Sequence, residues 1–268
     1  MSSAEDASPS LHDQIPALAP GQVWLAGAGP GDPGLLTLYA HAALRSADVI
    51  VHDALVDKRV LALAGPQAKL EFAGKRGGRP SATQADISKR LIELAKSGMR
   101  VLRLKGGDPC VFGRGGEEAI ALAAAGVPFR IIPGVTAGLA APAAAFIPVT
   151  MREVNRAVIF AAGHGAEDDG YDWGPLARAG APIVLYMVLH NLDRITAALM
   201  RAGRDPKTPT AVVAGATTLQ QRVLVSTLER VAQHARDQAF EPPAVVVVGE
   251  IVALRNRLLG AEKEETER

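Results

Sequence analysis

Short apolar runs alternate with helical patterns over most of the chain, from residue 23 to residue 248. Runs such as 23–26 and 245–248 contain no charged side chain, and segments of helical length lie between the runs. Strands that are apolar throughout must be covered on both faces, which is typical of sheets flanked by helices. We therefore predict an α/β fold, and 268 residues are enough for two such domains.

The predicted elements follow this alternation. Ser81 or Thr83 is expected to cap the second helix, and glycines at 126 and 203 are expected to end the third and fourth. We expect strands at 23–26, 47–51, 69–72, 101–104, 129–132, 157–161, 183–188, 211–214, 223–225 and 244–248, and helices at 35–45, up to 97, 117–125, 192–200 and 227–235.

A stretch rich in proline, glycine and alanine marks the expected boundary between the domains. Between Arg130 and Arg152 lie 21 uncharged residues, long enough to span a bilayer. Three prolines and many alanines make a membrane span a poor interpretation, and we predict a tightly packed segment instead. The expected organisation is a disordered arm (1–20), an N-terminal α/β domain (21–133), an inter-domain segment (134–150), a C-terminal α/β domain (151–260) and a charged tail (261–268).

The loop after the first strand matches a dinucleotide-binding pattern. Residues 27–34 contain G-x-G-x-x-G, and Asp53 lies 19 residues beyond the last of these glycines, where the fingerprint places an acid that binds a ribose. Pro30 and Pro33, however, remove two amide donors from the loop that would hold a pyrophosphate. A nicotinamide-dependent oxidoreductase and a turn whose glycines only permit close packing both stay open on this pattern.

Two further glycine loops follow the fourth and fifth predicted strands, at 105–118 and 133–137. Ligands of open α/β sheets bind at the carboxyl ends of strands, so Asp108 could accept hydrogen bonds from hydroxyl or ammonium groups there. Glu117 and Glu118 are better explained as residues of a helix first turn than as catalytic groups. Thr136 is either a helix N-cap or a ligand contact.

The motifs in residues 27–33, 52–56, 74–76, 105–118 and 133–137 together resemble the tetrapyrrole methylases, in particular those members that act on uroporphyrinogen III. The resemblance covers residues 21–258, and the loop 105–118 is its most specific part. It implies two α/β domains with mixed sheets, an active-site cleft between them, and a homodimer. It also implies that the first loop shapes the cleft and holds no pyrophosphate.

The reaction implied by the resemblance is the transfer of two methyl groups from S-adenosylmethionine to carbons 2 and 7 of uroporphyrinogen III. The product is precorrin-2, formed through precorrin-1, on the way to cobalamin or sirohaem. Many relatives have Asn-Gly-Thr where this chain has Gly215-Ala216-Thr217, so we expect the contact at Ala216 through the backbone. The residues implied as cofactor contacts are Pro30, Gly106, Gly107, Asp108, Val111, Thr136, Ala137, Met187, Ala216 and Ala244.

Asp53 matches the proposed proton acceptor of the family and Lys75 the proposed donor. Methylation of a pyrrole carbon creates a cation that must lose a proton, and a carboxylate can stabilise that cation and take the proton. The alternative is a strand-end turn residue for Asp53 and a surface charge for Lys75.

Charge is unevenly distributed along the sequence. Residues 75–156 hold 13 Lys and Arg against 6 acids, whereas the net charge of the chain is +1. The near-neutral total argues against a protein whose whole surface binds nucleic acid, and the basic span suits a substrate with eight carboxylates. Arg76, Arg79, Arg114 and Arg152 are the candidate carboxylate partners.

The remaining expectations concern metals, location and rival functions. Six histidines without metal-ligand spacing predict no metal site, and a single cysteine with no signal sequence fits the cytoplasm. The alternatives are a methylase of a later precorrin, the oxidoreductase, and a non-catalytic tetrapyrrole carrier.

Overall fold

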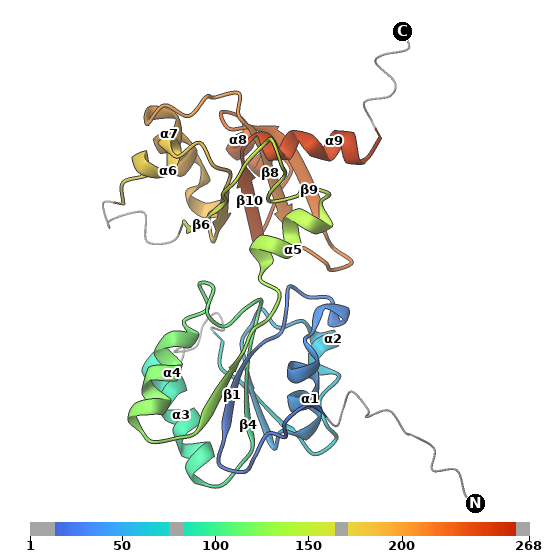
Figure 1. The fold of residues 1–268 in the computed structure, drawn as a ribbon, viewed down its shortest axis with the longest axis vertical. Coiled ribbons are helices and arrows are strands. Elements are labelled where there is room, and N and C mark those ends of the chain that lie inside the picture. Colours follow the sequence, from blue (N-terminus) through green and yellow to red (C-terminus); the bar gives the residue numbers. More distant parts are fainter. Residues whose placement is uncertain (1–13, 75–82, 164–170, 261–268) are drawn as a thin grey trace, which may run out of the picture. The chain divides into compact units, whose positions relative to one another are not determined.

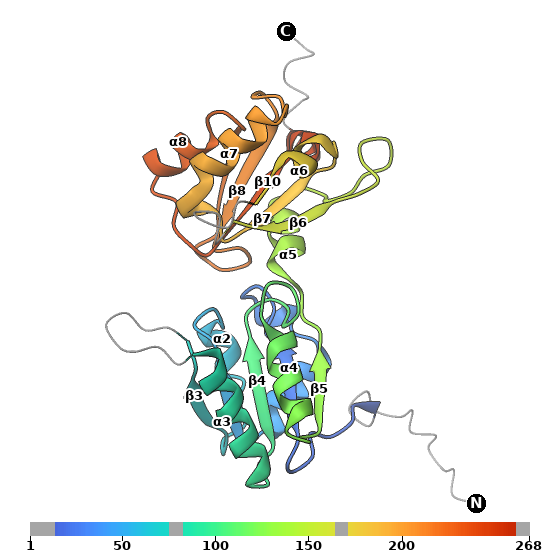
Figure 2. The ribbon, with the colours of Figure 1, turned by 90° about the vertical axis from the view of Figure 1, so that its left-hand side faces the viewer.

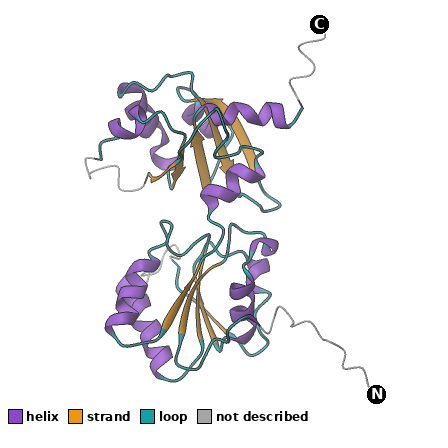
Figure 3. Ribbon diagram, in the orientation of Figure 1, coloured by secondary structure: helices purple, strands orange, loops and turns teal. Residues whose placement is uncertain are grey.

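The computed structural model describes residues 14–74, 83–163 and 171–260. The chain divides into two compact units, residues 1–135 and 136–268 (Figure 1). Each unit contains one five-stranded sheet with helices packed against it (Figure 3). The α/β fold predicted from the apolar runs is confirmed.

The sheet of the first unit is entirely parallel, in the order β3-β2-β4-β1-β5, so the mixed sheet expected for this domain is wrong. Helices α1 and α2 cover one face of this sheet, and α3 and α4 cover the other (Figures 1 and 2). The strands are β1 (Val23–Gly27), β2 (Val49–His52), β3 (Lys69–Phe72), β4 (Val101–Lys105) and β5 (Phe129–Ile132). The helices are η2 (Pro33–Leu35, a 3-10 helix), α1 (Leu38–Ser46), α2 (Lys58–Leu61), α3 (Gln84–Lys96) and α4 (Gly115–Ala124).

Alternation along β4 decides which side chains reach which helices. Leu102 and Leu104 belong to the core beside α1 and α2. Val101 belongs to the core beside α3 and α4, and Arg103 and Lys105 follow it at two-residue intervals on the same face. Two cations are thereby placed on a buried face of a central strand.

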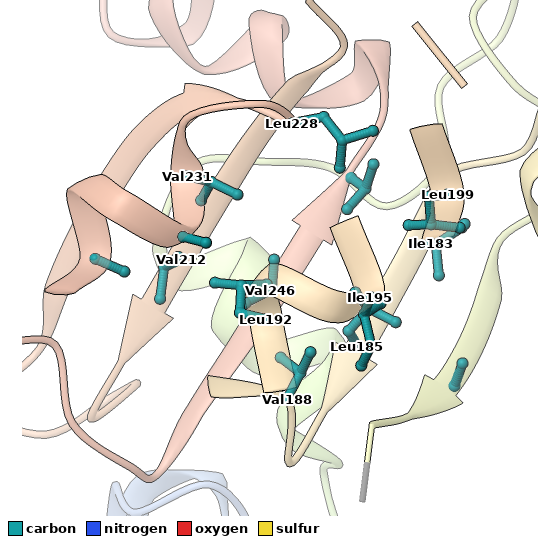
Figure 4. Close-up of a cluster of buried hydrophobic side chains, with 14 of the residues drawn as sticks. Ile183, Leu185, Val188, Leu192, Ile195, Leu199, Val212, Leu228, Val231 and Val246 are labelled. Carbon is teal, nitrogen blue, oxygen red and sulfur yellow. The ribbon is translucent and has the colours of Figure 1, made fainter. Parts of the chain in front are cut away.

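The sheet of the second unit is mixed, in the order β6-β7-β10-β8-β9. Strands β6 and β7 are parallel, and the other pairs are antiparallel. Figure 4 shows how side chains of α7 and α8, among them Leu192, Leu199 and Val231, pack on Leu185 and Val246 of the sheet. The strands are β6 (Ile159–Ala162), β7 (Ile183–Tyr186), β8 (Pro209–Ala214), β9 (Arg222–Thr227) and β10 (Ala244–Val248). The helices are α5 (Ala137–Ala144), α6 (Gly174–Arg178), η3 (Leu189–Asn191), α7 (Leu192–Arg201), α8 (Val231–Asp237), η4 (Glu250–Ala253) and α9 (Leu254–Leu258).

The uncharged stretch from 131 to 151 is not one continuous helix. It contains the end of β5, the eight-residue helix α5 and a following loop. Helix α5 contacts β7, β8 and β10, so most of the segment 134–150 belongs to the second unit. Within the part of the chain that the structure describes, no helix has the length and apolar character needed to cross a membrane.

Some predicted helix boundaries are wrong for identifiable reasons. The helix expected from residue 35 begins at Leu38, because Thr37 Oγ1 caps it by accepting from Ala40 N at 3.2 Å. The helix expected from Thr227 begins at Val231, because Thr227 still pairs with β8 as the last residue of β9. Thr83 caps α3 as expected, in a capping box with Asp86.

Candidate functional site

The loops after β1, β2, β4 and β5 meet at one edge of the first sheet, because all strands of that sheet are parallel. This is the edge where open α/β sheets bind ligands. Asp53 directly follows β2, and residues 106–108 directly follow β4. Of the predicted cofactor contacts, Pro30, Gly106, Gly107, Asp108 and Val111 lie here, and each keeps part of its surface exposed.

Close backbone contacts join the loops after β1, β4 and β5. Gly29 and Gly107 exchange two hydrogen bonds, with N–O distances of 3.1 and 2.7 Å. A Cβ on Gly27 would lie 2.6 Å from Gly134 Cα, so the end of β1 and the loop after β5 approach closely only because both residues are glycine.

Asp108 joins two of these loops. Its Oδ1 accepts from Cys110 N at 2.7 Å, and its Oδ2 accepts from Gly134 N at 2.9 Å. Each carboxylate oxygen can accept a further hydrogen bond, so the role expected for Asp108 toward a hydroxyl or ammonium group remains chemically available.

The same geometry disfavours dinucleotide binding at residues 27–34. The amide of Gly29 already donates to Gly107, and the amide of Gly34 donates to Asp32 Oδ1 at 2.8 Å. Helix α1 begins only after Thr37, so its N-terminus does not open directly from this loop. The glycine pattern serves close packing between loops, which was one of the two interpretations left open.

Four ionised side chains form a buried charge cluster beneath this edge: Asp53, Arg103, Lys105 and Glu118. Arg103 Nη2 lies 2.5 Å from Asp53 Oδ1, and Lys105 Nζ lies 3.4 Å from Asp53 Oδ2. Both cations also reach Glu118 Oε1, at 3.1 Å each. The side chain of Asp53 is 26% exposed, whereas the other three are at most 4% exposed. Asp53 is thus the one member of the cluster that reaches the surface.

The expectation that Glu118 lies in the first turn of α4 is confirmed, but its side chain also takes part in the buried charge cluster. Its neighbour Glu117 does lie on the exposed side and pairs with Arg114 at 2.7 Å. Glu118 points inward and also accepts from Gln84 Nε2 at 2.8 Å. Sequence reasoning also missed Arg103 and Lys105, although two cations on one face of a central strand require buried anions.

The predicted substrate-binding arginines are only partly within the described residues. Lys75, Arg76 and Arg79 lie outside them. Arg114 has a left-handed backbone, with φ of 59°, and its ion pair with Glu117 raises its pKa. Arg152 is exposed on a loop of the second unit.

The second unit gathers the other five predicted cofactor residues at one end of its sheet. Met187 follows β7, Ala216 lies just beyond β8, and Ala244 begins β10. The strand register places these positions together. Ala244 of β10 pairs with Ala214 of β8, and the next residue of β10, Val245, pairs with Tyr186 of β7. Thr136 and Ala137 lie at the start of α5, which Tyr186 holds to the same end of the second sheet.

Tyr186 binds the start of α5 through its hydroxyl. Tyr186 Oη lies 2.8 Å from Thr136 Oγ1 and accepts from Gly138 N at 2.8 Å. Thr136 occupies the N-cap position, but its side chain makes no capping hydrogen bond. Tyr186 was not predicted, because its partners lie about 50 residues earlier in the chain.

Met187, next to Tyr186, is held in an uncommon backbone conformation. Its φ is 52° and its residue is 48% exposed. Non-glycine residues in the left-handed region cluster at functional sites. Phe112, Arg114 and Thr217 share this property and lie in the loops after β4 and β8.

No group of three or more His, Cys, Asp or Glu residues could hold a metal ion among the described residues. The charged side chains nearest Asp53 are Arg103 and Lys105, which pair with its carboxylate.

These features define an α/β protein whose candidate site residues lie at the ends of its strands. The chain belongs to the family of tetrapyrrole (corrin/porphyrin) methylases, whose model matches residues 22–232. It is 58% identical over 247 residues to a uroporphyrinogen-III C-methyltransferase of a Sinorhizobium species, covering 91% of this chain and 88% of that protein.

Two further relatives extend the comparison. A siroheme synthase of Methylococcus capsulatus is 44% identical over 98% of this chain, and the chain spans 58% of its length. The crystal structure of uroporphyrin-III C-methyl transferase from Thermus thermophilus, complexed with S-adenosylhomocysteine, is 40% identical, with a TM-score of 0.76, covering 87% of this chain and 99% of that one.

Proposed function

We propose that this protein transfers two methyl groups from S-adenosylmethionine to carbons 2 and 7 of uroporphyrinogen III, giving precorrin-2 through precorrin-1. The observation that carries the proposal is the partly exposed carboxylate of Asp53, held by Arg103 and Lys105 at the strand ends. The relatives with uroporphyrinogen-III methyltransferase names support the choice of substrate.

Asp53 is the proposed proton acceptor. Bound S-adenosylmethionine supplies an electrophilic methyl group, and methylation leaves positive charge on the pyrrole. A fixed carboxylate stabilises that charge without reorganising, and it then takes the proton lost from the neighbouring carbon. Because each oxygen of Asp53 is anchored by a different cation, the carboxylate presents one orientation to the substrate.

The ten predicted cofactor residues are proposed to contact S-adenosylmethionine. The partly exposed glycines at 106 and 107 fit this role, because backbone without side chains lets a ligand approach. A Cβ on Gly106 would lie 2.8 Å from Leu55 Cβ, so Gly106→Arg would crowd this loop. We expect S-adenosylhomocysteine to raise the melting temperature of the parent protein but not of this variant. NAD should shift neither, which separates the methyltransferase from the oxidoreductase.

Lys75 is proposed as the proton donor, and Arg76, Arg79, Arg114 and Arg152 as partners of the substrate carboxylates. The support for Arg114 is its exposed guanidinium in the loop after β4. If Arg114 binds substrate, Arg114→Gln should raise KM for uroporphyrinogen III and leave the binding of S-adenosylhomocysteine unchanged.

We also propose a homodimer that works in the cytoplasm and feeds cobalamin or sirohaem synthesis. The support is the family resemblance for the dimer, the single cysteine for a reducing compartment, and the siroheme synthase relative for the pathway. Light scattering of the purified chain at several concentrations tests the dimer.

The test of the activity is incubation with uroporphyrinogen III and isotope-labelled S-adenosylmethionine, followed by mass spectrometry. Two methyl groups per substrate support the proposal. Transfer only to a later precorrin would favour that alternative, and binding of uroporphyrinogen III without transfer would favour a carrier.

A further inference from the structure

We propose that Glu118 is a positioning residue, which orients Asp53 through Arg103 and Lys105. This inference rests on the proposed function, since it concerns the carboxylate proposed to take the proton. Glu118 itself has no exposed side-chain surface, so it acts on the reaction only through its neighbours.

The contacts of Glu118 are concentrated on one atom. Its Oε1 accepts from Arg103 Nε, Lys105 Nζ and Gln84 Nε2 at 3.1, 3.1 and 2.8 Å. Its Oε2 is buried and has no hydrogen-bond partner among the described residues. The carboxylate of Glu118 therefore contacts both cations through Oε1, while Oε2 contributes no hydrogen bond to a described residue.

Stability does not explain this arrangement. A buried charge loses its hydration, and an unpaired buried oxygen adds to that cost. Buried ion-pair clusters can often be replaced by apolar groups with no loss of stability. In this cluster of four charges, Glu118 Oε2 has no hydrogen-bond partner in the part of the chain that the structure describes. Such a cluster is better explained by what it positions than by the stability it contributes.

Geometry shows what Glu118 positions. Each cation bridges the two carboxylates: Arg103 through Nε and Nη2, and Lys105 through Nζ. The two cations reach different oxygens of Asp53, so together they restrict its rotation. If Glu118 lost its charge, each cation would keep only Asp53 as an anionic partner and would move toward it.

The test is a double-mutant cycle on the full chain, with methyl transfer to uroporphyrinogen III as the activity. Glu118→Gln keeps the side-chain volume and removes the charge. We expect kcat to fall about 100-fold in the parent background, the effect of a small misplacement of a reacting group. When Glu118→Gln is added to Asp53→Asn, kcat should fall by less than a further factor of about two, because contributions that act through one residue are not additive.

Two readouts separate positioning from a general structural role. In Glu118→Gln, S-adenosylhomocysteine should raise the melting temperature as much as it does in the parent. The KM of this variant for S-adenosylmethionine should also equal that of the parent. Glu93→Gln, the same substitution on the exposed side of α3, serves as the control and should leave kcat unchanged.

Three results would overturn the inference: parental kcat in a folded Glu118→Gln variant, an equal loss in both backgrounds, or a lost response to S-adenosylhomocysteine. If Glu118→Gln does not fold, Glu118→Asp decides, because it keeps the charge and withdraws the carboxylate by one methylene. Its kcat must fall about tenfold on the same argument, and parental kcat there overturns the inference.

The design distinguishes this inference from the function on which it rests. An active parent with parental kcat in Glu118→Gln refutes only the role of Glu118. Parental kcat in Asp53→Asn refutes the roles of both residues and leaves the methyltransferase activity standing. A parent that transfers no methyl group refutes the proposed function and the inference with it.

Discussion

Arg103 on β4 donates to Asp53 at the end of β2, with Nη2 2.5 Å from Oδ1. The guanidinium is buried and the carboxylate is partly exposed, so a buried arginine fixes the position of a carboxylate that reaches the surface. This contact joins the core of the first unit to the residue proposed to carry the chemistry.

Asp53→Asn should abolish most of the activity without disturbing the fold. An amide has nearly the same shape as the carboxylate but cannot accept the proton, so we expect kcat to fall about 100-fold or more. Binding of S-adenosylhomocysteine, measured by calorimetry, should be retained. Asp57→Asn, at the cap of α2, is the control and should keep parental kcat.

Gly134→Ala should destabilise the first unit. The added Cβ would contact Gly107 O and lie 2.7 Å from Gly27 Cα, where only backbone atoms could move away. Such overpacking costs about 1–3 kcal/mol of unfolding free energy, which urea denaturation measures. Gly116→Ala is the matched control, because its Cβ meets no atom within 4 Å. It lies in α4, so it should be neutral or stabilising, and an equal loss at both glycines would contradict the close approach of the loops.

Tyr186→Phe should destabilise the second unit and weaken the binding of S-adenosylhomocysteine. The change removes the oxygen that contacts Thr136 and accepts from the buried amide of Gly138. An unsatisfied buried amide costs about 1–3 kcal/mol, and the start of α5 loses its anchor. Thermal unfolding and calorimetry measure the two effects. Tyr39→Phe keeps its ring contacts with Trp24 and Arg130 and is the control.

Acid should weaken the contact between β3 and α3. The hydrogen-bonded ion pair with Arg90 lowers the pKa of Glu71 from 4.5 to about 2. Because the pKa is lower in the folded state, this pair stabilises the fold above pH 4.5, and the contribution disappears as the pH falls from 4.5 toward 2. Arg90 is 44% exposed, so after solvent screening we expect about 1 kcal/mol.

Glu71→Gln tests this contribution by urea denaturation. The variant should be less stable than the parent by that amount at pH 6, and the two should converge near pH 2. A difference that stays constant across this range would contradict the assignment. Glu229→Gln is the control, because it makes the same substitution in an exposed ion pair, with Arg230.

The strands could be predicted from the sequence because their apolar runs are local. Runs such as Ala244–Val248 were found with their bounds unchanged. Short helices such as α2 and α9 were not predicted, because four or five residues show too little periodicity and depend on tertiary contacts. The sequence predicts a helix from Thr227, because the pairing of β9 with β8 is not visible in the local sequence.

The site could be predicted only where a motif carries it. Asp53 and the loop 105–118 follow from sequence patterns, and the structure places them at one edge of the first sheet. The inward direction of Glu118 depends on how α4 is rotated on the sheet, and the contact of Tyr186 with Thr136 depends on packing between distant segments. The roles of all the candidate site residues, Asp53 and Lys75 among them, stay predictions.

The most direct test of the account is the number of methyl groups that the protein transfers to uroporphyrinogen III, counted by mass spectrometry with labelled S-adenosylmethionine. The account predicts two methyl groups per substrate for the parent protein, and less than about 1% of the parental rate for Asp53→Asn. No transfer to uroporphyrinogen III by the folded parent, or an Asp53→Asn variant that methylates as fast as the parent, would contradict it.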